Sequence, residues 1–229
     1  MRYAYIAVVI LLLLTASCGQ TMLHESDRTI LLKQQRQELS KIPEQWDLIG
    51  RISIIYEQEN WHARFHWKKQ SNQFQLRFTG PLGETYLVLE QEQDKSSLKR
   101  LSQDKPLIEK RIKNTLRIGN EVYVSYGNIE ALLAEHSDIA IPINSLQYWI
   151  FGHYNPQYPY QIKMFSADDS VTVEDSVAAI DELFQQDWKI QFSRYKQQQA
   201  VSYPAKMIAR NNEYVIKVFV SSRRFNLNN

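Results

Sequence analysis

The chain has 229 residues, of which 44% are hydrophobic and 23% charged, a composition that supports a folded core and excludes a disordered or collagen-like chain. Its 27 Lys and Arg nearly balance 25 Asp and Glu, so the basic surface typical of a nucleic-acid-binding protein is not expected. The single cysteine, Cys18, excludes an intrachain disulfide framework and a cysteine-based zinc site.

The N-terminus predicts an export signal followed by a lipid anchor. Arg2 precedes an apolar run over residues 4–14, which suits a secretory signal and is too short for a bilayer, since a spanning helix needs about 20 residues. Small residues then lead to Cys18, a pattern that resembles a bacterial lipobox. The alternative is an ordinary signal peptide with an incidental cysteine.

Cleavage before Cys18 predicts three parts of the chain. Residues 1–17 are the lipoprotein signal peptide, residues 18–28 the acylated N-terminus and tether, and residues 29–229 a single domain. Acylation would anchor the mature chain firmly, because each buried methylene contributes about 0.8 kcal/mol. Gly19, in place of an Asp after the cysteine, favours the outer membrane.

Hydrophobic periodicity predicts one antiparallel sheet with helices in its middle. An amphipathic helix is expected over residues 29–40. Alternating apolar and polar residues then predict a series of strands. These cover residues 46–56, 61–67, 74–78, 86–89, 98–101, 107–113, 115–118, 187–195, 205–209 and 214–220.

Two short helices are expected between the strands. Asn128 can cap a helix over residues 129–136, and Asn144 or Ser145 can cap one over residues 146–151 that ends at Gly152. The Tyr- and Pro-rich residues 153–170 are expected to be irregular. The fold class is therefore α+β, with a strongly curved antiparallel sheet or open barrel in a single domain.

No pattern of catalytic residues emerges from the sequence. The nucleophile elbow, P-loop, zinc-protease and dinucleotide-binding motifs do not occur. His62 and His66 have the spacing of a helical metal pair, but on a strand they would lie about 13 Å apart. We therefore expect no enzyme, no metal and no cofactor.

Several segments, taken in order, resemble the LolB family of outer-membrane lipoprotein receptors. The similar segments are Trp46-x-Leu48-x-Gly50-Arg51-Ile52, Trp61-x-Ala63-x-Phe65-x-Trp67, Phe74-x-Leu76-x-Phe78-Thr79-Gly80-Pro81-Leu82-Gly83 and Ile141-Pro142-x-x-x-Leu146-x-Tyr148-Trp149-Ile150-x-Gly152. Trp188-x-Ile190 and Pro204, at the opening of the next strand, also fit the family.

The resemblance implies a fold and a function. It implies an open antiparallel β-barrel with short helices covering a hydrophobic cavity, as in LolA and LolB. It also implies a monomeric receptor in the outer membrane, facing the periplasm of a Gram-negative bacterium. The receptor would take acylated lipoproteins from the periplasmic carrier LolA and insert them among the outer-membrane lipids, without nucleotide, metal or nucleic acid. The residues expected to line the acyl-chain cavity are Trp46, Ile52, Trp61, Phe65, Trp67, Phe74, Leu76, Phe78, Leu146, Trp149 and Ile150.

Two other interpretations of these residues remain open. The aromatic side chains could fill a closed core, in which case the protein would be a structural envelope lipoprotein. A lipid hydrolase is the third possibility, and it lacks a nucleophile site.

Gly80, Pro81, Leu82 and Gly83 predict a tight turn between two apolar strands. Pro81 suits the second position of a β-turn, and glycines tolerate special dihedral angles. The family resemblance implies that Leu82 is exposed and serves insertion of cargo into the membrane. The alternative is that Leu82 folds back into the core.

Overall fold

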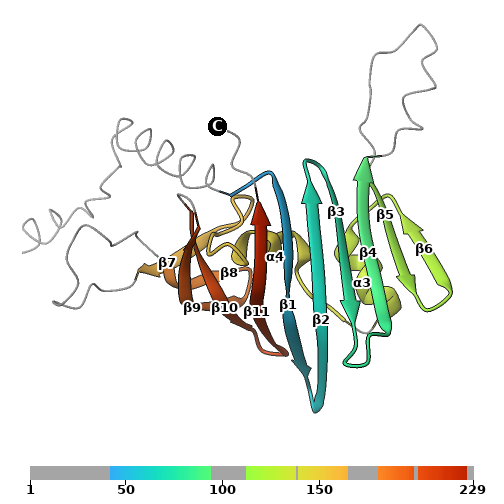
Figure 1. Ribbon diagram of the computed structural model, residues 1–229. Helices are drawn as coiled ribbons and strands as arrows, with labels where there is room; N and C mark the ends of the chain where they lie inside the picture. The colour runs from blue at the N-terminus through green and yellow to red at the C-terminus, as the bar shows by residue number, and fades with distance from the viewer. Residues whose placement is uncertain (1–41, 94–111, 138, 165–179, 199–200, 226–229) are drawn as a thin grey trace, which may run out of the picture. The chain divides into compact units, whose positions relative to one another are not determined.

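The computed structural model describes residues 42–93, 112–137, 139–164, 180–198 and 201–225. Within these residues eleven antiparallel strands form one sheet, in the order β6-β5-β4-β3-β2-β1-β11-β10-β9-β8-β7 (Figure 1). β6 and β7 are the two edges, so the sheet is not closed. The predicted α+β fold, an open antiparallel sheet with short helices, is confirmed.

The strands form two meanders that meet where the first strand pairs with the last. The first meander contains β1 (Gln45–Tyr56), β2 (Glu59–Gln70), β3 (Gln73–Thr79), β4 (Thr85–Gln93), β5 (Ile112–Ile118) and β6 (Glu121–Ser125). The second contains β7 (Tyr160–Met164), β8 (Ile180–Gln185), β9 (Trp188–Gln198), β10 (Val201–Arg210) and β11 (Tyr214–Phe225). β1 pairs with β2 on one side and with β11 on the other.

One face of the sheet is buried and the other faces solvent. In β2, Ala63, Phe65 and Trp67 are buried, whereas the intervening Arg64 is exposed. β1, β3 and β9 alternate in the same way. This is the expected pattern for an antiparallel sheet with a core on one side.

Along the chain, two helices follow the first meander and precede the second in the described residues. α3 (Ile129–Ser137) begins as predicted, because the Oδ1 of Asn128 accepts the N–H of Glu130 at 2.8 Å. α4 (Ile143–Trp149) begins earlier than predicted, and no side chain caps it at Pro142. The predicted capping by Asn144 or Ser145 is therefore wrong. Gly152 has a φ of 77°, as a glycine just past a helix end commonly does.

Several strands differ from the prediction. β6 and β8 were not expected, and β7 occupies part of a segment expected to be irregular. β5 runs without a break from Ile112 to Ile118, across the gap expected between the strands at 107–113 and 115–118, and residues 107–111 lie outside the described residues. The signal segment, Cys18, the tether, the helix over 29–40 and the strand over 98–101 lie outside the described residues.

Candidate functional site

The buried face of the sheet gathers the apolar residues that the sequence analysis placed in a cavity. Together with Val218 of β11, seven of those eleven residues enclose a small void between the sheet and α4: Ile52, Phe65, Trp67, Leu76, Phe78, Leu146 and Ile150. β1, β2 and β3 supply one wall. Leu146 of α4 and Ile150, just after that helix, supply the other. Val218 was not singled out from the sequence, although it alternates in phase with Ile216 and Val220 of β11.

The remaining four predicted residues lie around this void. Trp46 and Phe74 pack edge-on against Trp67, with ring centroids 5.2 and 6.0 Å away. Trp61 is half-buried and packs edge-on against Phe78 at 5.2 Å. Trp149 is fully buried but does not line the void. Its ring faces Trp188 of β9 at 6.1 Å.

The interior is closed. The void between α4 and the sheet measures about 10 Å³, roughly the volume that one water molecule requires. Phe65 is only 3% exposed. An acyl chain could therefore enter this space only if α4 and its flanking residues moved away from the sheet.

Hydrogen bonds hold α4 against the sheet at several points. The buried side chain of Gln185 in β8 accepts the indole N–H of Trp149 and the backbone N–H of Asn155, both at 2.9 Å. The Nζ of Lys69 in β2 donates to the Oε1 of Gln147 at 2.8 Å, and burial lowers the pKa of Lys69.

Arg223 of β11 forms a further attachment where α4 ends. Its Nη2 donates to the carbonyl oxygens of Ile150 at 2.9 Å and Pro204 at 2.6 Å. The guanidinium lies over the ring of Tyr203, 4.0 Å from the centroid. Burial lowers the pKa of Arg223 to about 9, so the group remains charged at neutral pH.

Two buried indole groups have no hydrogen-bond acceptor. Nε1 of Trp46 and Nε1 of Trp67 are unpartnered within the described part of the chain. Buried polar groups are seldom left without a partner, because each unpaired donor costs about 1–3 kcal/mol. The apolar interior thus contains two donors that a carbonyl oxygen could satisfy.

The turn between β3 and β4 places an apolar side chain in solvent. The N–H of Gly83 donates to the carbonyl oxygen of Gly80 at 3.1 Å, so Pro81 and Leu82 occupy the central positions of a β-turn. Gly83 has a φ of 94°, which favours glycine. Leu82 is 96% exposed, so it does not fold back into the core.

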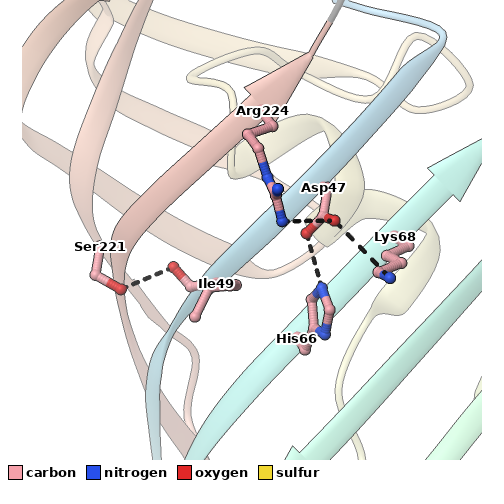
Figure 2. Close-up of polar contacts among 6 residues, drawn as sticks. All are labelled: Asp47, Ile49, His66, Lys68, Ser221 and Arg224. Atoms are coloured by element: carbon pink, nitrogen blue, oxygen red, sulfur yellow. Dashed lines mark hydrogen bonds and ion pairs between the residues drawn. The ribbon is translucent and has the colours of Figure 1, made fainter.

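Ionisable side chains on the outer face form structural contacts. His62 and His66 lie on a strand, as predicted. Figure 2 shows Asp47 between His66, Lys68 and Arg224, and the Asp47 Oδ1 lies 2.7 Å from the His66 Nε2. The described ranges contain no group of three or more His, Cys, Asp or Glu residues placed to hold a metal ion. They also contain no helix that is both long and apolar enough to cross a membrane.

Comparisons with known proteins agree with this architecture. The protein is 23% identical over 215 residues to the outer-membrane lipoprotein LolB of Psychromonas ingrahamii, covering 93% of this chain and 92% of that protein. It is also 23% identical over 224 residues to the LolB of Vibrio vulnificus, covering 96% of both. A DUF1329 family protein from Desulfovibrio piger has a similar fold, with a TM-score of 0.54 and 12% identity over 83% of this chain and 89% of its own.

The family profile covers almost all of the described sheet. The profile of the family described as "Outer membrane lipoprotein LolB" matches residues 44–117 and 101–222. These ranges include the apolar face of β1, β2 and β3, the exposed turn at Leu82, and α4. The chain therefore belongs to the LolB family of outer membrane lipoproteins.

Proposed function

We propose that the protein is an outer-membrane receptor and chaperone that accepts acylated lipoproteins and inserts them into the inner leaflet of that membrane. The main observation in support of this function is the apolar interior between α4 and strands β1, β2 and β3. Family membership supports the coarser statement, a role in localising lipoproteins to the outer membrane. No catalytic step is needed, because burial of acyl chains can drive transfer.

Acceptance of a cargo would require α4 to move. Opening would exchange contacts between α4 and the sheet for contacts between the sheet and acyl chains, which bury comparable apolar surface. The cargo's ester and amide carbonyl groups would meet the unpaired indole donors of Trp46 and Trp67. A periplasmic carrier of the LolA type would supply the cargo.

Delivery is assigned to the turn of Gly80, Pro81, Leu82 and Gly83. An exposed leucine can enter the boundary between headgroups and acyl chains, where its side chain leaves water. The mature protein would act as a monomer, anchored through acylated Cys18 and facing the periplasm. Residues 1–17 would be the signal peptide, residues 18–28 the tether, and residues 29–229 the cargo-binding domain.

A two-stage assay of the full chain tests this function. A carrier loaded with a radiolabelled lipoprotein is mixed with the protein in detergent, and the cargo bound to each is measured. Liposomes are then added, and the cargo recovered with them is counted. Phe65→Glu should abolish uptake, because an ionised carboxylate in an apolar site costs several kcal/mol.

Arg77→Gln is the control for this substitution. Arg77 is an exposed residue of β3, and its replacement should leave uptake unchanged. If the wild-type protein takes up no cargo, the receptor function is wrong. The closed void of about 10 Å³ would then favour the second candidate, a structural envelope lipoprotein with a filled core.

A further inference from the structure

The face of the sheet opposite α4 carries a row of cations across its centre. Arg64 of β2 lies directly opposite Arg51 of β1, and Arg51 lies opposite Phe219 of β11. Lys206 of β10 pairs with Phe219 and continues the row. Like charges directly opposite each other on neighbouring strands destabilise a sheet. A negatively charged group shared by Arg51 and Arg64 would remove this repulsion.

The row borders a pocket of about 430 Å³, a volume within the range of about 300–1,000 Å³ typical of small-ligand sites. Five cationic side chains line this basic pocket: Arg51, Arg64, Arg194, Lys206 and Lys217. No acidic residue of the described ranges lines it. None of the five forms an ion pair with another described residue.

Some cations elsewhere on the same face do have a carboxylate partner. Asp47 is 2.7 Å from His66, 3.4 Å from Arg224 and 3.9 Å from Lys68. Figure 2 draws these three contacts. That carboxylate offsets part of the positive charge around it. The basic pocket has no such carboxylate among the described residues, so its charge is available to an anion from outside the described chain.

Two of the guanidinium groups lie near the same aromatic ring. The guanidinium carbons of Arg51 and Arg194 lie 5.8 and 6.0 Å from the ring centroid of Phe219, which is half-buried. Arg194 has a φ of 58°, a conformation that non-glycine residues rarely adopt and that concentrates at functional sites. The pocket thus combines guanidinium groups with an aromatic surface.

The basic pocket adjoins the exposed turn. Pro81 lines the pocket, and the next residue, Leu82, is the exposed apolar tip. A surface that presents cations beside an apolar side chain matches a lipid leaflet, which presents phosphates beside an apolar layer.

We propose that the basic pocket binds the phosphate of an anionic phospholipid headgroup while Leu82 enters the apolar layer beside it. Guanidinium groups suit this ligand, because their N–H groups can bind two phosphate oxygens at once. The proposal rests on the proposed function for the presence of the protein at a membrane. It adds a lipid ligand and a binding orientation to that function.

Calorimetric titration of the full acylated chain in a non-ionic detergent tests the proposal. The titrants are dihexanoyl phosphatidylglycerol, the phosphate-free dihexanoylglycerol, and inorganic phosphate. The double variant Arg51→Gln/Arg64→Gln should weaken binding of the phospholipid about tenfold or more, because hydrogen bonds to charged groups are lost. The double variant Arg77→Gln/Lys196→Gln removes two exposed cations that do not line the pocket, and its affinity should match that of the wild type.

Each result decides for or against the basic pocket. Binding of the phospholipid, with weak or no binding of the other two titrants, supports it. Equal binding of inorganic phosphate or of dihexanoylglycerol overturns it in favour of a free-anion site or an acyl-chain site. Equal losses in the two double variants overturn it in favour of diffuse charge. If Arg51→Gln/Arg64→Gln lost binding to the carrier but kept binding to the phospholipid, this face would be a protein-docking surface. That result would also overturn the proposal.

Two of these variants separate this proposal from the receptor function. Phe65→Glu should lose cargo uptake and keep phospholipid binding, whereas Arg51→Gln/Arg64→Gln should show the reverse. Removal of the like-charged pair should not impair folding, and circular dichroism checks this. Lys206→Gln/Lys217→Gln provides a second test, on strands β10 and β11, and should also weaken phospholipid binding. Full phospholipid affinity in that variant would count against the pocket.

Discussion

Leu82 keeps a large apolar side chain in water at the tip of the turn between β3 and β4. We predict that Leu82→Glu leaves the free energy of unfolding within about 0.5 kcal/mol of the wild type, because exposed substitutions rarely do more. Uptake of cargo should persist, since the apolar interior is unchanged. Recovery of cargo in liposomes should fall sharply, because a carboxylate resists entry into the apolar layer. Chemical denaturation and the two-stage assay measure these effects.

Leu82→Met is the control for that substitution, since it keeps an apolar side chain of similar size. It should deliver cargo as the wild type does. Normal delivery by Leu82→Glu would remove the turn from the mechanism of release.

Gly50 sits where two strands come too close for any side chain. A Cβ at this position would lie 2.6 Å from the ring of Phe65 and would clash with the carbonyl oxygen of Phe219. Gly50→Ala should therefore lower the free energy of unfolding by about 1–3 kcal/mol, as overpacking does. Urea denaturation measures this. Gly127→Ala, whose Cβ would meet only the Ser125 Oγ at 3.6 Å, should change stability little, and equal losses would refute the argument.

The sequence predicted which residues are buried where the signal was local to one strand, and it failed where contacts between elements decide. Alternation correctly placed Phe65, Trp67 and Phe78 on one buried face, because period-two burial is a local property of a strand. The absence of Trp149 from the void was not foreseeable, since it depends on which side of α4 faces β9. Nor did the sequence indicate the basic pocket. Arg51, Lys206 and Phe219 are distant in sequence and meet only through strand pairing.

At the scale of elements, Glu130 connects the two helices. Its Oε1 accepts the backbone N–H of Asn144 at 2.8 Å, which satisfies a donor at the start of α4. Burial raises the pKa of Glu130, and the hydrogen bond from Asn144 opposes that shift. A carboxyl group with a raised pKa makes the folded state less stable above that pKa, and this penalty disappears as the pH falls below the ordinary carboxyl range.

Glu130→Gln should therefore be more stable than the wild type at pH 7, and the difference should shrink toward pH 4. The amide oxygen of Gln can still accept the Asn144 N–H. Glu130→Ala removes that acceptor and should lose about 1–3 kcal/mol near pH 4, because a buried donor is left unpaired. The loss should be smaller at pH 7, because Ala also removes the penalty of the ionised carboxylate. Thermal unfolding across the pH range measures both variants. A stability difference between Gln and Glu that does not vary with pH would contradict the assigned shift.

The sequence did not predict the strands and the helix start that depend on contacts with other elements. β6 is a short edge strand, and Val122 and Val124 on it remain exposed, so it lacks the usual buried alternation. β7 forms through pairing with β8. Its residues 160–164 alternate apolar and polar side chains, but this short signal follows a Tyr- and Pro-rich stretch and was missed. α4 begins without a side-chain cap, because Glu130 from α3 satisfies the N–H of Asn144 instead. In each case contacts with another element, and not the local sequence pattern alone, fix the structure.

At the scale of the whole molecule, the closed interior and the receptor function agree only if α4 can open. If a small fraction of molecules is open, the apparent dissociation constant for an apolar ligand is the intrinsic constant divided by that fraction. Weakening the contacts that close α4 should then tighten apparent binding even while it destabilises the fold. A rigid, filled core predicts destabilisation without binding. The two outcomes distinguish the receptor from a structural lipoprotein.

Gln185 is the residue with which to test this, because its side chain joins β8 to Trp149 and to the segment after α4. Gln185→Met keeps the length of the side chain but removes its hydrogen bonds, which should lower the free energy of unfolding by about 3 kcal/mol. We expect several-fold tighter apparent binding of an apolar aminonaphthalene probe, measured by fluorescence titration of the full chain. Gln191→Met makes the same change on an exposed part of β9 and should leave probe affinity unchanged. A destabilised Gln185→Met protein that binds no more probe than the wild type would mean that the interior does not open, because the loosened contacts would have raised the open fraction.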